Sequence, residues 1–188
     1  MKKGFTLIEL LIVIGILAVL AVAVVLVLNP AELLAQARDS QRISDLSSIK
    51  SAIGFYLATA ASPALGEAAR CTVACAGGLP ADGPFNLESE TTNAGTAVDG
   101  SGWVGVALTG ATGGSPLATL PLDPSQTATY FYAYDGNNTA KTFELNGRLE
   151  SNKFRVQMTS DGGDNNTCVT YVEDTCYYEL GTEPGLDF

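Results

Sequence analysis

The sequence contains no histidine among its 188 residues. Histidine is the commonest general base at neutral pH and the commonest metal ligand in proteins, and Ser-His and Cys-His nucleophiles require it. The G-x-S-x-G elbow, the Walker phosphate loop and the H-E-x-x-H zinc motif are also missing. These absences argue against an enzyme, and we assign no catalytic residue.

Basic residues are scarce in the C-terminal two thirds of the chain. From Ser62 onward there are 16 Asp and Glu against 5 Lys and Arg, a net charge of −11, whereas the residues before Ser62 carry a net charge of +1. An acidic surface repels the phosphate backbone of nucleic acids. Direct nucleic-acid binding is therefore not expected.

The run from Phe5 to Leu28 almost lacks polar residues. It is 24 residues long and is interrupted only by Thr6, Glu9 and Gly15. A membrane-spanning helix needs about 20 apolar residues, whereas a cleavable secretory signal has an apolar region of about 7–15. Two lysines precede the run, so the positive-inside tendency places the first residues in the cytoplasm and the rest of the chain outside.

The segment Lys3-Gly4-Phe5-Thr6-Leu7-Ile8-Glu9 resembles the prepilin-peptidase signal of type IV pilins and type II secretion pseudopilins. The resemblance covers the first 60 residues or so and implies cleavage between Gly4 and Phe5. It also implies N-methylation of Phe5 and a role for Glu9 in assembly. The partners that it implies are the prepilin peptidase, an assembly platform with its ATPase, further copies of the chain and other pilins.

The charge of Glu9 admits two interpretations. In a filament, the carboxylate of Glu9 would pair with the new ammonium group on Phe5 of a neighbouring subunit, because a paired buried charge is far less costly than an unpaired one. Alternatively, Glu9 reaches the lipid headgroups, since it lies only about 6 Å of helical rise from Phe5. The flanking motif favours the assembly role.

A second helical segment is expected after the apolar run. Asn29-Pro30 interrupts the helix and predicts a kink at Pro30, and Ser62-Pro63 stops the continuation near Ala61. Within it, an apolar stripe recurs at helical spacing and is expected to pack on a sheet. The stripe consists of Leu46, Ile49, Ile53 and Tyr56 or Leu57.

The charged residues of this second segment are expected on a solvated face with weak ion pairs, or against neighbouring subunits in a filament. They are Arg38, Asp39, Arg42 and Asp45.

The remaining chain predicts a small antiparallel sheet. The range 62–102 is expected to form a long irregular connection, since it is rich in Ala, Gly, Thr and Pro. Strands are expected at 103–108, 129–134 and 141–145, with a turn at Asp135–Asn138 between the last two. Just before this hairpin, Leu120-Pro121-Leu122-Asp123-Pro124 resembles the LP-x-DP entry of many pseudopilins and Gram-positive-like pilins.

The four cysteines form two pairs close in sequence, Cys71 with Cys75 and Cys168 with Cys176. An even number of cysteines in an exported domain indicates disulfides, and four cysteines allow three connectivities. We favour the two local pairs. Zinc is the alternative, although the spacing is not the usual C-x-x-C.

The loop at 160–166 is rich in oxygen ligands and predicts either a calcium site or an ordinary polar turn. Its candidate ligands are Asp161, Asp164, Asn165 and Asn166. Calcium is the only cofactor that this loop predicts. The triplets Asn137-Asn138-Thr139 and Asn165-Asn166-Thr167 match the N-x-T acceptor of N-glycosylation, but turn chemistry suffices to explain Asn137.

Together these features predict an α+β fold with a long kinked N-terminal helix packed on a small antiparallel sheet, as in pilins. Residues 1–4 would be a leader, 5–28 the transmembrane and filament-core helix, 29–61 its amphipathic continuation and 62–188 an extracellular head. The expected function is that of a filament subunit, stored as a single-pass precursor in the cytoplasmic membrane. The alternatives are a pseudopilin and a solitary membrane-anchored exported binding domain.

Overall fold

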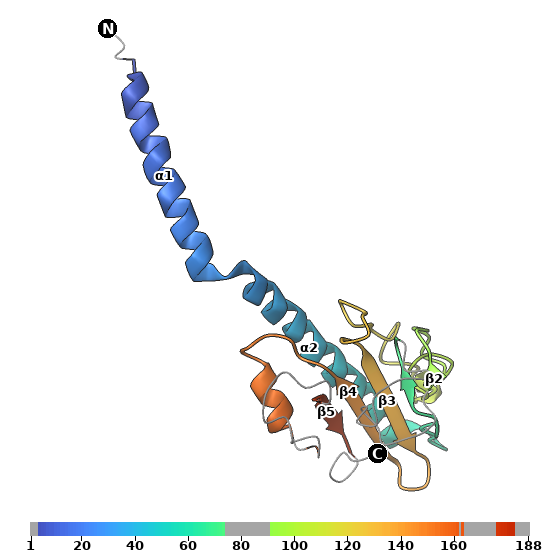
Figure 1. The fold of residues 1–188 in the computed structure, drawn as a ribbon. Coiled ribbons are helices and arrows are strands. Elements are labelled where there is room, and N and C mark those ends of the chain that lie inside the picture. The colour runs from blue at the N-terminus through green and yellow to red at the C-terminus, as the bar shows by residue number, and fades with distance from the viewer. Residues whose placement is uncertain (1–3, 74–90, 162, 164–175, 183–188) are drawn as a thin grey trace.

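Two helices and a small mixed sheet make up the protein. The computed structural model describes residues 4–73, 91–161, 163 and 176–182. The helices are α1 (Leu7–Leu28) and α2 (Pro30–Thr59), and the 3-10 turns are η1 (Leu108–Gly110) and η2 (Arg155–Thr159). The strands are β1 (Arg70–Cys71), β2 (Thr91–Thr92), β3 (Tyr132–Asn137), β4 (Thr142–Gly147) and β5 (Tyr178–Gly181). The α+β, pilin-like fold is confirmed (Figure 1).

The sheet has the strand order β2-β1-β3-β4-β5. Its neighbouring strands are antiparallel except for β1 and β2, which run parallel. The prediction of a purely antiparallel sheet is therefore wrong at this edge. Strands β1 and β2 are each two residues long, which is too short to leave an alternating pattern in the sequence. The rest of this connection is irregular where it is described.

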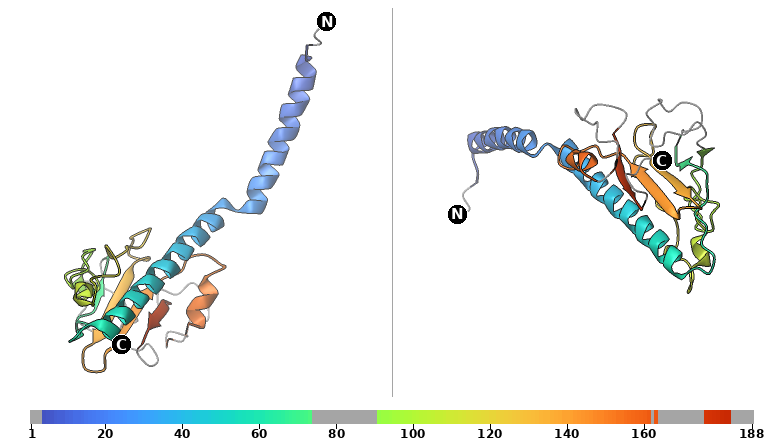
Figure 2. Two further views of the ribbon diagram at one scale, coloured as in Figure 1. Left: turned by 180° about the vertical axis from the view of Figure 1, so that it is seen from behind. Right: turned by 90° about the horizontal axis from the view of Figure 1, so that it is seen from below.

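Helix α2 lies along one face of the sheet, whereas α1 extends away from the head (Figures 1 and 2). The predicted apolar stripe of α2 is buried against the sheet, which confirms that prediction. On the sheet side the core is formed by Tyr132, Tyr134, Phe143 and Leu145. Helix α2 lies close to the sheet, because a Cβ built on Gly147 of β4 would lie 3.0 Å from Leu46 Cδ1.

The predicted hairpin is confirmed, but its turn is displaced. Strands β3 and β4 pair in register, and the turn occupies residues 138–141 rather than Asp135–Asn138. The side chain of Asn137 sets this position, because its Oδ1 accepts hydrogen bonds from the backbone N–H groups of Thr139 and Ala140 at 2.8 and 2.9 Å. Asn137 therefore has the turn role expected of it.

Residues 103–108 are not a strand, contrary to prediction. Within this segment Ala107 makes an isolated bridge to Asp99, and no strand pairing longer than this bridge is present in residues 103–108. The Trp103 indole N–H donates to Pro121 O at 2.9 Å. Just before this segment, the Arg70 guanidinium donates to the carbonyls of Gly100 and Gly102. The apolar residues enter the core through irregular backbone.

Candidate assembly surface

The bond between Gly4 and Phe5 precedes the first helical turn. The Phe5 side chain is 88% exposed, and no atom of the described residues lies within 4 Å of a Cβ built on Gly4. The packing of the described chain therefore neither covers this bond nor requires a glycine at position 4.

Glu9 caps the helix in which it lies. Thr6 is the N-cap residue of α1, and both its backbone N–H and its hydroxyl donate to Glu9 Oε2 at 2.8 Å. In return, the Glu9 backbone N–H donates to Thr6 Oγ1 at 3.3 Å. This reciprocal arrangement is a capping box, and the carboxylate also interacts favourably with the positive end of the helix dipole. Our sequence interpretation missed this role, although Thr6-Leu7-Ile8-Glu9 matches the T-x-x-E signature of such a box.

The surface of α1 is apolar and uncovered. The stretch Leu7–Val25 is long and apolar enough to cross a membrane and has none of its residues buried. Leu10, Leu11, Ile14 and Leu17 are each between 58 and 60% exposed. A continuous apolar surface of this kind indicates a bilayer or a protein partner.

The helical conformation is completely interrupted between α1 and α2. Asn29 has a left-handed backbone conformation, with φ 39° and ψ 74°, and its Oδ1 accepts a 3.5 Å hydrogen bond from Glu32 N. Pro30 occupies the first turn of α2, where its missing N–H is not needed. The result is two capped helices rather than one kinked helix.

A buried ionic network holds the first half of α2 to the head. The Arg42 guanidinium donates to Asp123 Oδ2 at 2.6 Å, to Asp39 Oδ1 at 2.8 Å and to Glu150 Oε1 at 2.9 Å. The ring of Tyr130 lies 4.8 Å from the guanidinium carbon. We call Arg42 and its three carboxylates the Arg42 network.

The Arg42 network corrects the expectation of a solvated charged face. Asp39 and Arg42 have no exposed surface, and the Asp39 carboxylate also accepts hydrogen bonds from the backbone N–H groups of Glu150 and Ser151. The two residues continue the helical spacing of Leu46, which places them on the buried side of α2. This helical spacing is the feature of the sequence that could have predicted the burial of both residues.

The pKa values of two carboxyl groups, Asp45 on α2 and Glu150 on the head, are shifted in opposite directions. Burial acts to raise the pKa of Glu150, but the hydrogen bonds from Arg38 and Arg42 prevail and the pKa is lowered. For Asp45, burial prevails over a hydrogen bond from the Tyr132 hydroxyl at 3.1 Å, and the pKa is raised.

Comparison with known families identifies the N-terminal segment. Residues 1–25 match the prokaryotic N-terminal methylation motif. They carry the prepilin-type signal of type IV pilins and pseudopilins. The comparisons with curated proteins and with solved structures find no significant match to the chain. The prepilin-type signal and the bare apolar helix support an exported protein like type IV pilins or pseudopilins, and they point to a structural protein.

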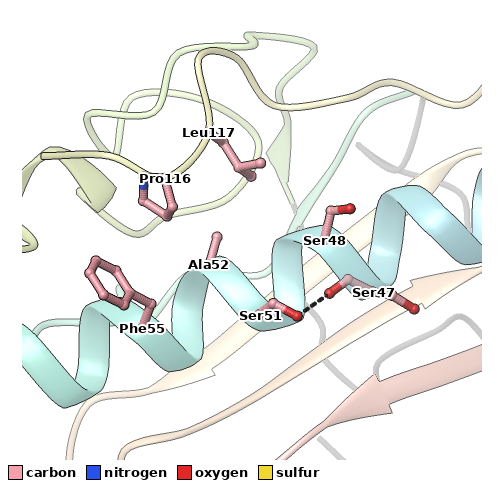
Figure 3. A pocket seen from close by; sticks show the side chains of 7 residues that line it. All are labelled: Ser47, Ser48, Ser51, Ala52, Phe55, Pro116 and Leu117. Atoms are coloured by element: carbon pink, nitrogen blue, oxygen red, sulfur yellow. Dashed lines mark hydrogen bonds between the residues drawn. The ribbon is translucent and has the colours of Figure 1, made fainter.

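The outward face of α2 in this prepilin-type chain carries a groove without charged side chains (Figure 3). It is lined by Ser47, Ser48, Ser51, Ala52, Phe55, Pro116 and Leu117. Two of these serine hydroxyls bind the backbone of the helix, since Ser51 Oγ donates to Ser47 O and Ser48 Oγ to Ser44 O, each at 2.8 Å. The groove therefore offers a mostly apolar surface beside the half-exposed ring of Phe55.

The calcium prediction is not decided. Asp164, Asn165 and Asn166 lie outside the described residues, and the described part of the chain contains no group of three side chains suited to a metal. The described ligand candidate, Asp161, accepts hydrogen bonds from the backbone N–H groups of Gly163 and Glu179 at 3.2 and 3.0 Å. Burial raises the pKa of the Asp161 carboxyl.

The disulfide connectivity also stays a prediction. Cys75 and Cys168 lie outside the described residues. Cys71 and Cys176 are buried, and neither carries a free thiol.

Proposed function

We propose that the chain is a structural subunit of a type IV pilus-like extracellular filament. The observation that supports this most directly is α1, an apolar helix that has no buried residue from Leu7 to Val25 and is joined to a folded head. In the membrane, its apolar surface faces lipid. In a filament, the same surface packs against α1 helices of other copies and of other pilins, so one surface serves storage and assembly.

The assembly step proposed here begins with the prepilin peptidase. Cleavage between Gly4 and Phe5 leaves an ammonium group on Phe5, which is then methylated. Glu9, which caps its own helix in this structure, would pair with the Phe5 ammonium of a neighbouring copy. This pairing fixes the register of adjacent helices, since an unpaired charge there would be costly. An assembly platform and its ATPase would lift the subunit from the membrane.

Two other functions remain as alternatives. A pseudopilin of a type II secretion-like system is favoured by the LP-x-DP segment, whose Asp123 carboxylate binds Arg42. A solitary membrane-anchored binding domain would use α1 only as an anchor, and neither leader cleavage nor Glu9 would then matter to it.

The test replaces Glu9 in native cells and measures the subunit in sheared filaments. Glu9→Leu removes both the charge and the cap, whereas Glu9→Gln keeps a side chain that can complete a capping box. We expect neither variant to be incorporated, because both lack the charge. Normal incorporation of Glu9→Gln would refute the pairing role.

The intact mass of the unaltered protein distinguishes the three functions. An abundant filament species without residues 1–4, methylated on Phe5 and four hydrogens lighter through its four cysteines, supports the pilus subunit. The same species confined to the cell envelope indicates a pseudopilin, and a working chain that retains its leader indicates an anchored domain.

A further inference from the structure

A short basic and apolar segment interrupts the acidic head at residues 153–156. It consists of Lys153, Phe154, Arg155 and Val156, and we call it the 153–156 patch. Lys153 is exposed, with its Nζ 4.9 Å from the centre of the Phe154 ring. The Val156 side chain is 51% exposed at the start of η2. Cationic and apolar groups therefore reach solvent together.

The charge of the patch is unusual for the head. Two of the 5 basic residues that follow Ser62 lie in this patch. The other three have different surroundings: the Arg70 guanidinium donates to backbone carbonyls, Arg148 is buried, and Lys141 donates to Pro63 O beyond the β3–β4 hairpin. Within the head, the 153–156 patch is the place where two basic residues lie close together in the sequence.

The patch lies at the end of the head from which the membrane helix leaves. The backbone N–H of Asn152 donates to Glu32 Oε1 at 2.9 Å, and Asn152 Nδ2 donates to Glu32 Oε2 at 3.3 Å. Glu32 is in the first turn of α2, four residues after α1 ends at Leu28. Figure 2 shows η2 beside the start of α2. Leu33 and Leu34, in the same part of α2, are 51 and 61% exposed.

The acidic groups beside the patch are already engaged. Glu150 is paired with Arg38 and Arg42, and the Glu32 carboxylate accepts hydrogen bonds from Asn152 and Gln36. These two carboxylates are therefore turned toward partners within the described residues, while Lys153 faces solvent.

We propose that the 153–156 patch docks on the anionic phospholipid headgroups of the membrane that α1 crosses. Basic residues are attracted to an anionic bilayer surface, and aromatic and apolar side chains beside them enter the interface. Docking would hold the acidic head in a fixed orientation while the subunit is stored. This inference concerns the stored precursor and does not depend on which filament or secretion system later receives it.

The test uses the full chain inserted in vesicles, with tryptophan as a probe. The native Trp103 is fully buried, so Val156→Trp adds an emitter at the patch over a constant background. Lipids brominated near the headgroup quench a tryptophan that touches the interface. We expect quenching of Val156→Trp in vesicles containing phosphatidylglycerol, with weaker quenching in phosphatidylcholine alone and at high salt, which screens surface charges. Ala140→Trp, at the hairpin turn, should not be quenched.

A matched pair of charge reversals identifies the contact. In the Val156→Trp background, Lys153→Glu should lower the phosphatidylglycerol-dependent quenching several-fold. Lys141→Glu, which reverses the charge of another exposed lysine, should leave the quenching unchanged. Equal effects of the two reversals would overturn the proposal. Quenching that is insensitive to lipid charge or to salt would also overturn it, and this measurement requires no charge variant to fold.

Discussion

The two helices of this protein reverse the usual relation between polarity and burial. Helix α1 exposes its apolar side chains along its length, whereas α2 buries two fully charged ones, Asp39 and Arg42. Asn29 alone separates them. Each helix therefore suits a different surrounding: the apolar surface of α1 suits an apolar medium, whereas α2 packs on the head itself.

The difference also shows where each helix obtains its stability. The backbone hydrogen bonds of α1 are satisfied within the helix and the capping box closes its first turn, so α1 remains intact in an apolar medium. Helix α2 depends on tertiary contacts, since its stripe and its ionic network both require residues of the head. Changes in α2 should therefore alter the stability of the head, whereas changes in α1 should alter membrane insertion and assembly.

The largest expected effect comes from breaking the Arg42 network. Arg42→Ala leaves Asp39 and Asp123 buried without their cation, which should lower the free energy of unfolding by about 3–5 kcal/mol. The measurement is urea unfolding of the full chain in detergent micelles, followed by the fluorescence of buried Trp103. Arg38→Ala is the matched control, because among the described residues this neighbouring arginine binds only Glu150 and is partly exposed, and it should cost far less. Equal losses in the two variants would show that the network contributes nothing particular.

A pair of leucine truncations compares the two helices directly. Leu46 is fully buried and Leu17 is 58% exposed. Leu46→Ala should destabilise the head by about 2–5 kcal/mol, because it removes buried methyl groups and leaves a cavity. Leu17→Ala should leave the same urea transition unchanged. A shift of the transition by Leu17→Ala would mean that α1 contributes to head stability, contrary to the comparison.

How much of this could be read from the sequence depends on the distance between the interacting residues. The prepilin-type signal, the apolar helix and the stripe from Leu46 to Tyr56 are local patterns, and all three were predicted. The spacing from Leu46 places Arg42 on the buried side of α2, but no local pattern identifies the carboxylates that bind it, because Asp123 and Glu150 lie 81 and 108 positions away. A strand was also predicted at 103–108, but Trp103 there donates hydrogen bonds to Gly95 O and Pro121 O, which lie outside the predicted segment.

A substitution of Asn29, between the two helices, is expected to have a smaller effect on stability. Asn29→Ala removes the side-chain cap of α2 and places a Cβ-bearing residue without local polar compensation in the left-handed region, which should cost about 1–2 kcal/mol. Hydrogen exchange at the amides of Glu32 and Leu33 should accelerate accordingly. Asn29→Gly keeps the backbone conformation and should accelerate exchange less. Exchange that is unchanged in Asn29→Ala would show that α2 is held by the head alone.

The smallest effect distinguishes a carboxylate with an arginine partner from one without. Because burial raises the pKa of Asp45, the folded state binds its proton more tightly than the unfolded state, and stability falls as the pH rises through this raised pKa. Asp45→Asn should therefore raise the melting temperature slightly at neutral pH, with the gain vanishing below about pH 4. Glu150→Gln should do the opposite, since the pKa of Glu150 is lowered: it should lower the melting temperature at neutral pH, and the difference should close as the pH falls through this lowered pKa. Melting curves of the three proteins across this range measure both effects, and parallel responses of the two variants would contradict the assignment. Opposite responses would show that, of these two half-buried carboxylates, the one bound by a guanidinium stabilises the head and the other does not.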